Sequence, residues 1–343
     1  MKQKNEQYLT CCDTNVFKGL AILLMLWHHV FYQKQGMFDE FLFLSYGTIE
    51  YTRVMAKLCV SIFVFFSGYG LAVKVEQNGG EINIKDYYLR RFAKLYVNYW
   101  FVWLMFVPVS VFYFHRTLEM AYGTHVWGKA ILDFLGMIYS FTGSYPYNPT
   151  WWFYSCIILL YLIFPFLYRI VKRDVLYALL LCICLKYFPL DFLNPIRNYI
   201  YIFLAGMVFV THGLLKNENY PHYSWKKSYE RTAWLILLAI SLVERNNVGQ
   251  LADGVITCAL VKLYTLYPVS EYVKSTLAYL GIHSMNMFLI HTFFFDFWFS
   301  SQLYSLRNPI AIFLSLLVIC LVVSIGLEEV KKFMRINKLI RSI

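Results

Sequence analysis

Two side chains in one apolar stretch near the start of the chain could do chemistry together. Lys18 and His29 stand eleven residues apart, and nearly every residue between them is apolar. Eleven residues make almost three helical turns, so both side chains would point the same way, about 16 Å apart along the axis. A cation can hold an anionic phosphate, and a neutral imidazole with a pKa of about 6.5 can take a proton from an alcohol at pH 7.

Each of these two residues also has a purely structural explanation. Lys18 could extend its ammonium to the cytoplasmic membrane interface, as lysines near the ends of spans do. His29 could bond to a neighbouring helix, a contact worth about 0.6 kcal/mol in membranes. Because ionisable residues inside an apolar span are costly, their alignment on one face favours a functional role. His28 is rotated by about 100° from His29 and is expected to be structural.

A second group of cations follows further along the chain. Arg90, Arg91 and Lys94 fall within five residues, and Arg91 and Lys94 are one helical turn apart, so they would share a face. One interpretation is ordinary enrichment of positive charge on the cytoplasmic side, with contacts to lipid head groups. The other is a phosphate clamp for a nucleotide-containing donor.

Two other apolar runs contain polar residues that could serve a site. Ser67-Gly68-Tyr69 lies at the end of one run, where small residues could permit close helix packing or bend the backbone toward a ligand. Ser284 and His291 are seven residues apart in another run, almost on one face. His291 is a second imidazole inside a span, and packing and function explain it equally well.

The composition places the chain in the membrane class. Of 343 residues, 59% are hydrophobic and only 15% are charged, too few to solvate the surface of a soluble protein of this length. The net charge of +11 does not indicate a nucleic-acid partner, because the basic residues lie between apolar runs, as topology signals do. The eight cysteines show neither metal-ligand spacing nor a disulfide framework, so we expect no metal.

The apolar runs predict an all-α membrane protein, a polytopic bundle of about ten transmembrane helices. The expected spans are 16–34, 54–74, 95–114, 151–170, 175–189, 198–211, 232–245, 250–267, 276–298 and 309–330. Residues 128–142 are apolar but too short to span, which indicates a re-entrant or interfacial helix. Most Lys and Arg residues then fall on one side, so both termini are expected in the cytoplasm. We expect one domain, 1–343, with a cytoplasmic segment at 1–15 and a basic tail at 331–343.

Over nearly its whole length the chain resembles the acyltransferase 3 family of bacterial integral-membrane acyltransferases. The family's first span carries an Arg, ten intervening residues and a His, and here Lys18 takes the place of the Arg. The other matching motifs occur in the family's order: Phe65-Phe66-Ser67-Gly68-Tyr69, Arg91 with Lys94, Trp152-Phe153 through Tyr161 and Pro165, and Leu280-Gly281 through Ser284 and His291.

The resemblance implies transfer of an acyl group, most often acetyl, from cytoplasmic acyl-CoA to a hydroxyl of a glycan such as a cell-surface polysaccharide or its precursor. It suggests that His29 acts as general base or carries the acyl group covalently, with His291 assisting. The CoA phosphates would be held by Lys18, Arg91 and Lys94. Substrate would be contacted by Ser67, Tyr69, Trp152 and Ser284.

The expected setting is the bacterial cytoplasmic membrane, with acyl-CoA, the glycan acceptor and the lipid bilayer as partners and the oligomeric state open. The rival interpretation is a multi-pass transporter or exporter of a glycan or small polar metabolite, with the histidines as a proton relay. The sequence shows no inverted repeat of the kind found in many transporters.

Overall fold

The computed structural model describes residues 8–144, 147–215 and 225–336, and within these ranges the chain forms helices and no strand. The first half contains α1 (Cys11–Val30), α2 (Tyr46–Met55), α3 (Leu58–Gln77), α4 (Ile84–Phe112), α5 (Leu118–Tyr122), α6 (Val126–Phe134), α7 (Ile138–Thr142) and α8 (Trp152–Arg173). The second half contains α9 (Val175–Tyr187), η2 (Asp191–Leu193), α10 (Asn194–Arg197), α11 (Ile200–Thr211), α12 (Trp225–Val248), α13 (Gln250–Leu266), α14 (Glu271–Thr292), η3 (Phe293–Trp298), α15 (Ser300–Tyr304) and α16 (Pro309–Phe333).

Four helical stretches of the described chain are long and apolar enough to cross a membrane. They are Tyr46–Gln77, Ile84–Phe112, Trp152–Arg173 and Pro309–Phe333. A fifth crossing is present if Asp191–Arg197 and Ile200–Thr211, which meet at 48°, form one broken span. The protein is therefore a helical protein of the membrane type, whereas ten spans and cytoplasmic termini remain predictions. The outer parts of the expected terminal segments, 1–7 and 337–343, lie outside the described residues.

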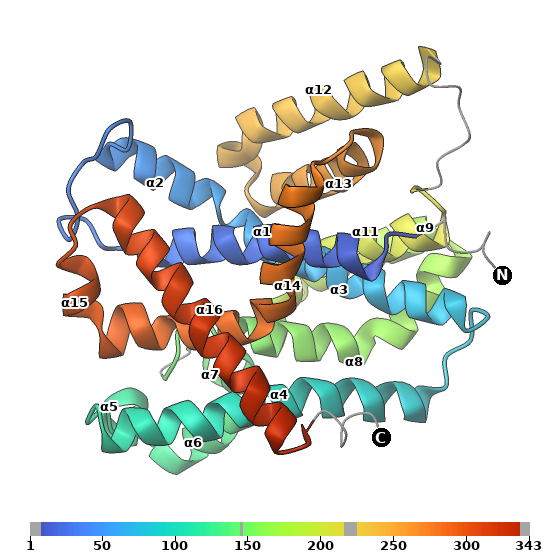
Figure 1. Cartoon of the computed structure of the whole chain (residues 1–343). Coiled ribbons are helices and arrows are strands. Elements are labelled where there is room, and N and C mark those ends of the chain that lie inside the picture. The colour runs from blue at the N-terminus through green and yellow to red at the C-terminus, as the bar shows by residue number, and fades with distance from the viewer. Residues whose placement is uncertain (1–7, 145–146, 216–224, 337–343) are drawn as a thin grey trace.

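The centre of the bundle consists of α1, α3, α11 and α14. Figure 1 shows the hairpin of α12 and α13 on one side of this centre, and α4, α5 and α6 on the other. Helices α3 and α11 approach at backbone distance because each has a glycine at their crossing. A Cβ on Gly68 of α3 would collide with the Phe203 backbone of α11, and a Cβ on Gly206 of α11 would collide with the Phe65 backbone of α3.

Several helix boundaries differ from those expected from the sequence. The run expected at 54–74 is broken at Ala56 and Lys57, so that α2 ends and α3 begins there. The helix that contains most of the third expected span, 95–114, begins earlier, at Ile84, which makes α4 a single helix of 29 residues. The apolar stretch 128–142 divides at a turn into α6 and α7, and neither is long enough to span. The first residues of the expected tail, Lys331 and Lys332, still belong to α16.

Candidate active site

The site is built on α1 and α14, which run parallel and are held together at both ends. At their first turns, Lys274 of α14 forms an ion pair with Asp13 of α1 at 3.1 Å. The Tyr264 hydroxyl of α13 donates to the same carboxylate at 2.6 Å. Burial alone would raise the pKa of Asp13, but hydrogen bonds from Thr10, Tyr264 and Lys274 together hold that pKa below its ordinary value. The Lys274 pKa is correspondingly raised, chiefly by its hydrogen bond with Asp13.

Glycines let the two helices pack closely between these ends. A Cβ on Gly19 of α1 would lie 2.7 Å from the carbonyl carbon of Leu277, and its oxygen would be nearer still. A Cβ on Gly281 of α14 would lie 2.7 Å from the carbonyl carbon of Asn15. The reciprocal arrangement fixes both the spacing and the register of α1 against α14. Any side chain at the far end of one helix is thereby placed against its counterpart on the other.

The side chains that meet at the far end are two histidines. The rings of His29 and His291 have centroids 5.1 Å apart, and His28 lies 4.9 Å from His29 on its other side. His291 is completely buried, whereas His29 is partly exposed. None of the described residues forms a hydrogen bond with the His29 ring, so both of its nitrogens are free for a reacting group. Sequence reasoning placed both histidines inside apolar runs but could not show that they touch.

The contacts of His291 fix its tautomer. Its Nδ1 lies 2.8 Å from the Phe288 carbonyl oxygen, which can only accept, so Nδ1 carries the proton and Nε2 presents a lone pair. Nε2 is 3.4 Å from the Thr292 hydroxyl, and this hydroxyl is 3.4 Å from that of Thr150. Thr150 in turn donates to the Asn148 side chain at 2.8 Å. A buried polar chain therefore leads from the histidine pair toward the start of α8.

His28 is hydrogen-bonded to the backbone of a neighbouring helix, and its structural role stays a prediction. Its Nδ1 lies 2.9 Å from the Arg53 carbonyl oxygen, which joins α1 to α2. The ring is buried and is therefore less accessible to a substrate than the His29 ring.

An ion pair joins the two stretches of chain that follow His29 and His291. Lys34 follows His29 by five residues, Asp296 follows His291 by five, and the two side chains pair at 2.8 Å. Asp296 belongs to η3, a π-helical stretch, and such stretches are frequent at functional sites. The Phe295 ring of η3 stacks on His291 with centroids 5.8 Å apart. Neither Lys34 nor Asp296 was expected from the sequence, because no local pattern indicates that they pair.

The three expected donor-binding cations gather near the opposite end of α1. Lys94 and Arg91 lie close enough to Lys18 for their positive charges to repel its ammonium. Within the described chain, none of the three forms an ion pair with a carboxylate. The Arg91 guanidinium lies 4.8 Å from the centre of the Tyr161 ring, and its buried Nε has no hydrogen-bond partner there. Three cations without a counter-charge can receive an anionic group such as a phosphate.

The remaining expected residues have contacts of their own. Ser67 bonds back to the Phe63 carbonyl of its own helix, and the buried Tyr69 hydroxyl accepts a hydrogen bond from the Leu9 amide at 2.8 Å. Ser284 is buried on α14 and donates to the Gly281 carbonyl. The Trp152 ring packs on Tyr199 with centroids 5.6 Å apart. Roles of these four residues in substrate binding stay predictions.

The tryptophan that reaches the helix carrying His291 is the neighbouring one. Trp151 is buried, and its Nε1 donates to the Leu289 carbonyl of α14 at 3.2 Å, two residues before His291. In the described part of the chain, no three His, Cys, Asp or Glu side chains come together as a metal site would require.

Comparison with known families decides the class of protein to which the chain belongs. The family model described as "Acyltransferase domain", that of acyltransferase 3, matches residues 13–329, nearly the whole chain. The chain belongs to the acyltransferase 3 family. The resemblance drawn from the motifs is thereby confirmed, and this acyltransferase 3 protein is an enzyme that transfers acyl groups other than aminoacyl groups. No curated protein and no solved structure matches the chain.

Proposed function

We propose that this acyltransferase moves an acyl group, chiefly acetyl, from cytoplasmic acyl-CoA to a carbohydrate hydroxyl. The observation that carries the proposal is the pairing of His29 with His291 at one end of α1, with the Lys18, Arg91 and Lys94 cations toward the other. One helix thus joins an anion-binding region to an imidazole with free nitrogens. The phosphates of CoA would bind at the cations, and the pantetheine arm would extend along α1 toward His29.

The chemistry assigned to the histidines is acid–base catalysis. His29 accepts the proton of the acceptor hydroxyl while its oxygen attacks the thioester carbonyl. A C–O bond forms, the C–S bond breaks, and the proton passes to the departing CoA thiolate. His291, whose Nε2 lone pair is fixed by the bond from Nδ1 to Phe288, assists this proton transfer. A covalent acyl-His29 intermediate would give the same products in two steps.

The proposed setting is the bacterial cytoplasmic membrane, with both termini inside. Lys18 then lies toward the cytoplasm, where acyl-CoA is made, and His29 lies toward the outer face. The carbohydrate acceptor would be a cell-surface polysaccharide or its precursor.

Isotope transfer tests the proposal. Membranes containing the protein are incubated with acetyl-CoA labelled in the acetyl group and with a glycan fraction from cells that lack the protein. Ester-bound label on the glycan, released by mild base, is the expected result. Movement of glycan across the membrane without transfer of label would instead establish a transporter and refute the proposal.

A further inference from the structure

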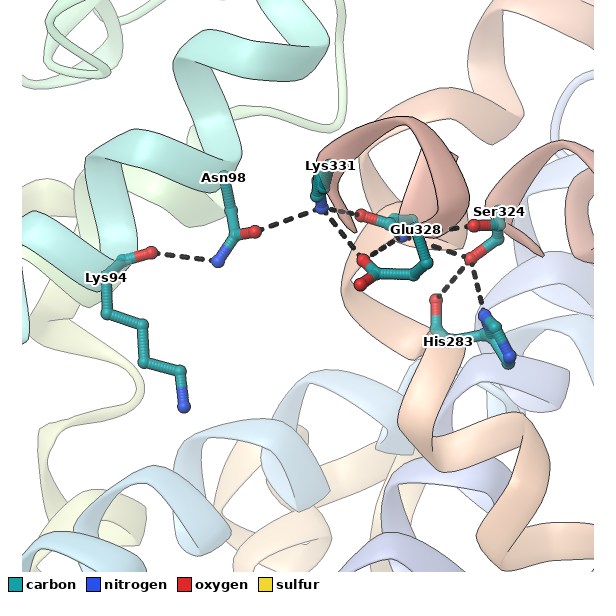
Figure 2. Close-up of polar contacts among 7 residues, drawn as sticks. Lys94, Asn98, His283, Ser324, Glu328 and Lys331 are labelled. Carbon is teal, nitrogen blue, oxygen red and sulfur yellow. Dashed lines mark hydrogen bonds and ion pairs between the residues drawn. The ribbon is translucent and has the colours of Figure 1, made fainter. Parts of the chain in front are cut away.

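A buried lysine near the end of α16 connects three helices around the site. Lys331 is 1% exposed, and its Nζ is hydrogen-bonded to side-chain oxygens of Asn286 at 2.8 Å, Glu328 at 2.9 Å and Asn98 at 3.0 Å (Figure 2). These partners come from α14, α16 and α4. An ammonium has three N–H donors, so each is matched to one acceptor. A buried charge is tolerated only when it is paired and hydrogen-bonded in this way.

The bond from Lys331 to Asn98 attaches α16 to the face of α4 that carries the expected donor cations. Asn98 lies four residues after Lys94 and seven after Arg91, which places the three on one face of the helix. Because an ammonium only donates, the Asn98 oxygen must face Lys331, and its amide nitrogen donates to the Lys94 carbonyl at 2.9 Å. Figure 2 shows the Lys94 ammonium extending away from this network. Lys94 is thus held by its backbone while its charge stays free.

The bond to Asn286 reaches the helix that carries His291, five residues further on. The Asn286 amide nitrogen donates to Glu328 at 2.8 Å and to the Ser324 hydroxyl at 3.2 Å. Ser324 also lies 2.9 Å from Nδ1 of His283 on α14. The same stretch of α16 is therefore fastened to α14 through several bonds and to α4 through Lys331.

We propose that Lys331 is a positioning residue for the acyl donor. It holds the Arg91 and Lys94 face of α4 at a fixed distance and rotation from α14, and so from Lys18 on α1, which packs against α14, so that the three cations can bind the donor phosphates together. Lys331 touches neither donor nor acceptor. The inference rests on the proposed use of acyl-CoA and adds a residue that the family's motifs in this sequence did not single out.

The test replaces the ammonium and separates donor affinity from turnover. Lys331→Met is expected to raise KM for acetyl-CoA about tenfold with kcat changed less than about twofold, because donor affinity is lost while the histidine pair is unchanged. The matched control is Lys332→Met, whose side chain is 75% exposed and pairs with the exposed Glu329 at 3.5 Å. The control should keep the wild-type KM.

A second variant separates loss of the link to α4 from a general folding defect. Asn98→Ala removes the bond to Lys331 and the bond to the Lys94 carbonyl but leaves Lys331 bonded to Asn286 and Glu328, so it should fold and still raise KM for acetyl-CoA. Both variants should also lose part of the wild-type preference for CoA over dephospho-CoA, a readout that general destabilisation would not move. Equal KM and equal preference in wild type and Asn98→Ala would overturn the inference. If the wild-type protein itself binds no CoA in detergent, the proposed function fails instead.

Discussion

Replacing Gly19 with alanine should lower the rate of acyl transfer, although Gly19 lies ten residues before His29 on α1. The added Cβ would lie 2.7 Å from the carbonyl carbon of Leu277, whereas ordinary contact begins at 3.4 Å. The helices must therefore separate by at least 0.7 Å, the difference between 3.4 and 2.7. Because the contact is with backbone, no flexible side chain can absorb it. A displacement of about 1 Å at a reacting pair can cost roughly a hundredfold in rate.

We therefore expect Gly19→Ala to lower kcat by about tenfold or more, measured as label transfer from acetyl-CoA by purified protein. The matched control is Gly70→Ala on α3, where a Cβ meets no atom within 4 Å. This control should keep full activity and gain up to about 1 kcal/mol of helix stability. A wild-type rate in folded Gly19→Ala would refute the idea that α1–α14 spacing sets the histidine pair.

Three further predictions concern charged residues. Lys18→Ala should raise KM for acetyl-CoA, whereas Lys18→Arg should preserve or lower it, since a guanidinium can bind phosphate through two bonds; equal values in all three proteins would contradict the clamp. Asp13→Asn should lower the melting temperature at pH 7 by removing the pair with Lys274. Because the folded Asp13 pKa is lowered, this stabilisation is present above about pH 4 and lost below it, so the difference should shrink in acid; a difference independent of pH would contradict it. Asp296→Asn and Lys34→Met should each lower kcat, and a double-mutant cycle should give a coupling of about 1 kcal/mol, whereas additivity would show that the pair does not act as a unit.

Local patterns in the sequence predicted the parts of the site that lie on one element. The spacing of Lys18 and His29 placed them on one helix, and α1 includes both. Ser284 and His291 likewise share α14. The family motifs carried the class of reaction, since five of them occur in order along the chain.

The parts that were missed depend on contacts between distant elements. The sequence cannot show that His29 meets His291, because their contact depends on the register that Gly19 and Gly281 impose. The π-helical stretch Phe293–Trp298 reads as the continuation of an apolar span, since its composition does not change. Lys331 reads as one basic residue of a cytoplasmic tail, and only the three oxygens around it distinguish it from Lys332.

The number of spans depends on helices that are short or that carry polar residues. Helices α1 and α14 carry the polar residues of the proposed site, and these lower their mean hydropathy below that of an ordinary span. The apolar α9 has only 13 residues. Counting apolar runs therefore treats short or polar-bearing helices as equal to full crossings, although length and composition support only four, or five with the bent pair.

The most direct test of the central claim is acetyl transfer by protein lacking the His29 imidazole. Wild type, His29→Ala and His125→Asn are compared in the same labelled acetyl-CoA assay after equal membrane insertion is verified. His125 is exposed and has a left-handed backbone that asparagine readily adopts, so its replacement should leave transfer unchanged. We predict that His29→Ala transfers no label above background. Transfer at the wild-type rate by inserted His29→Ala would contradict the account.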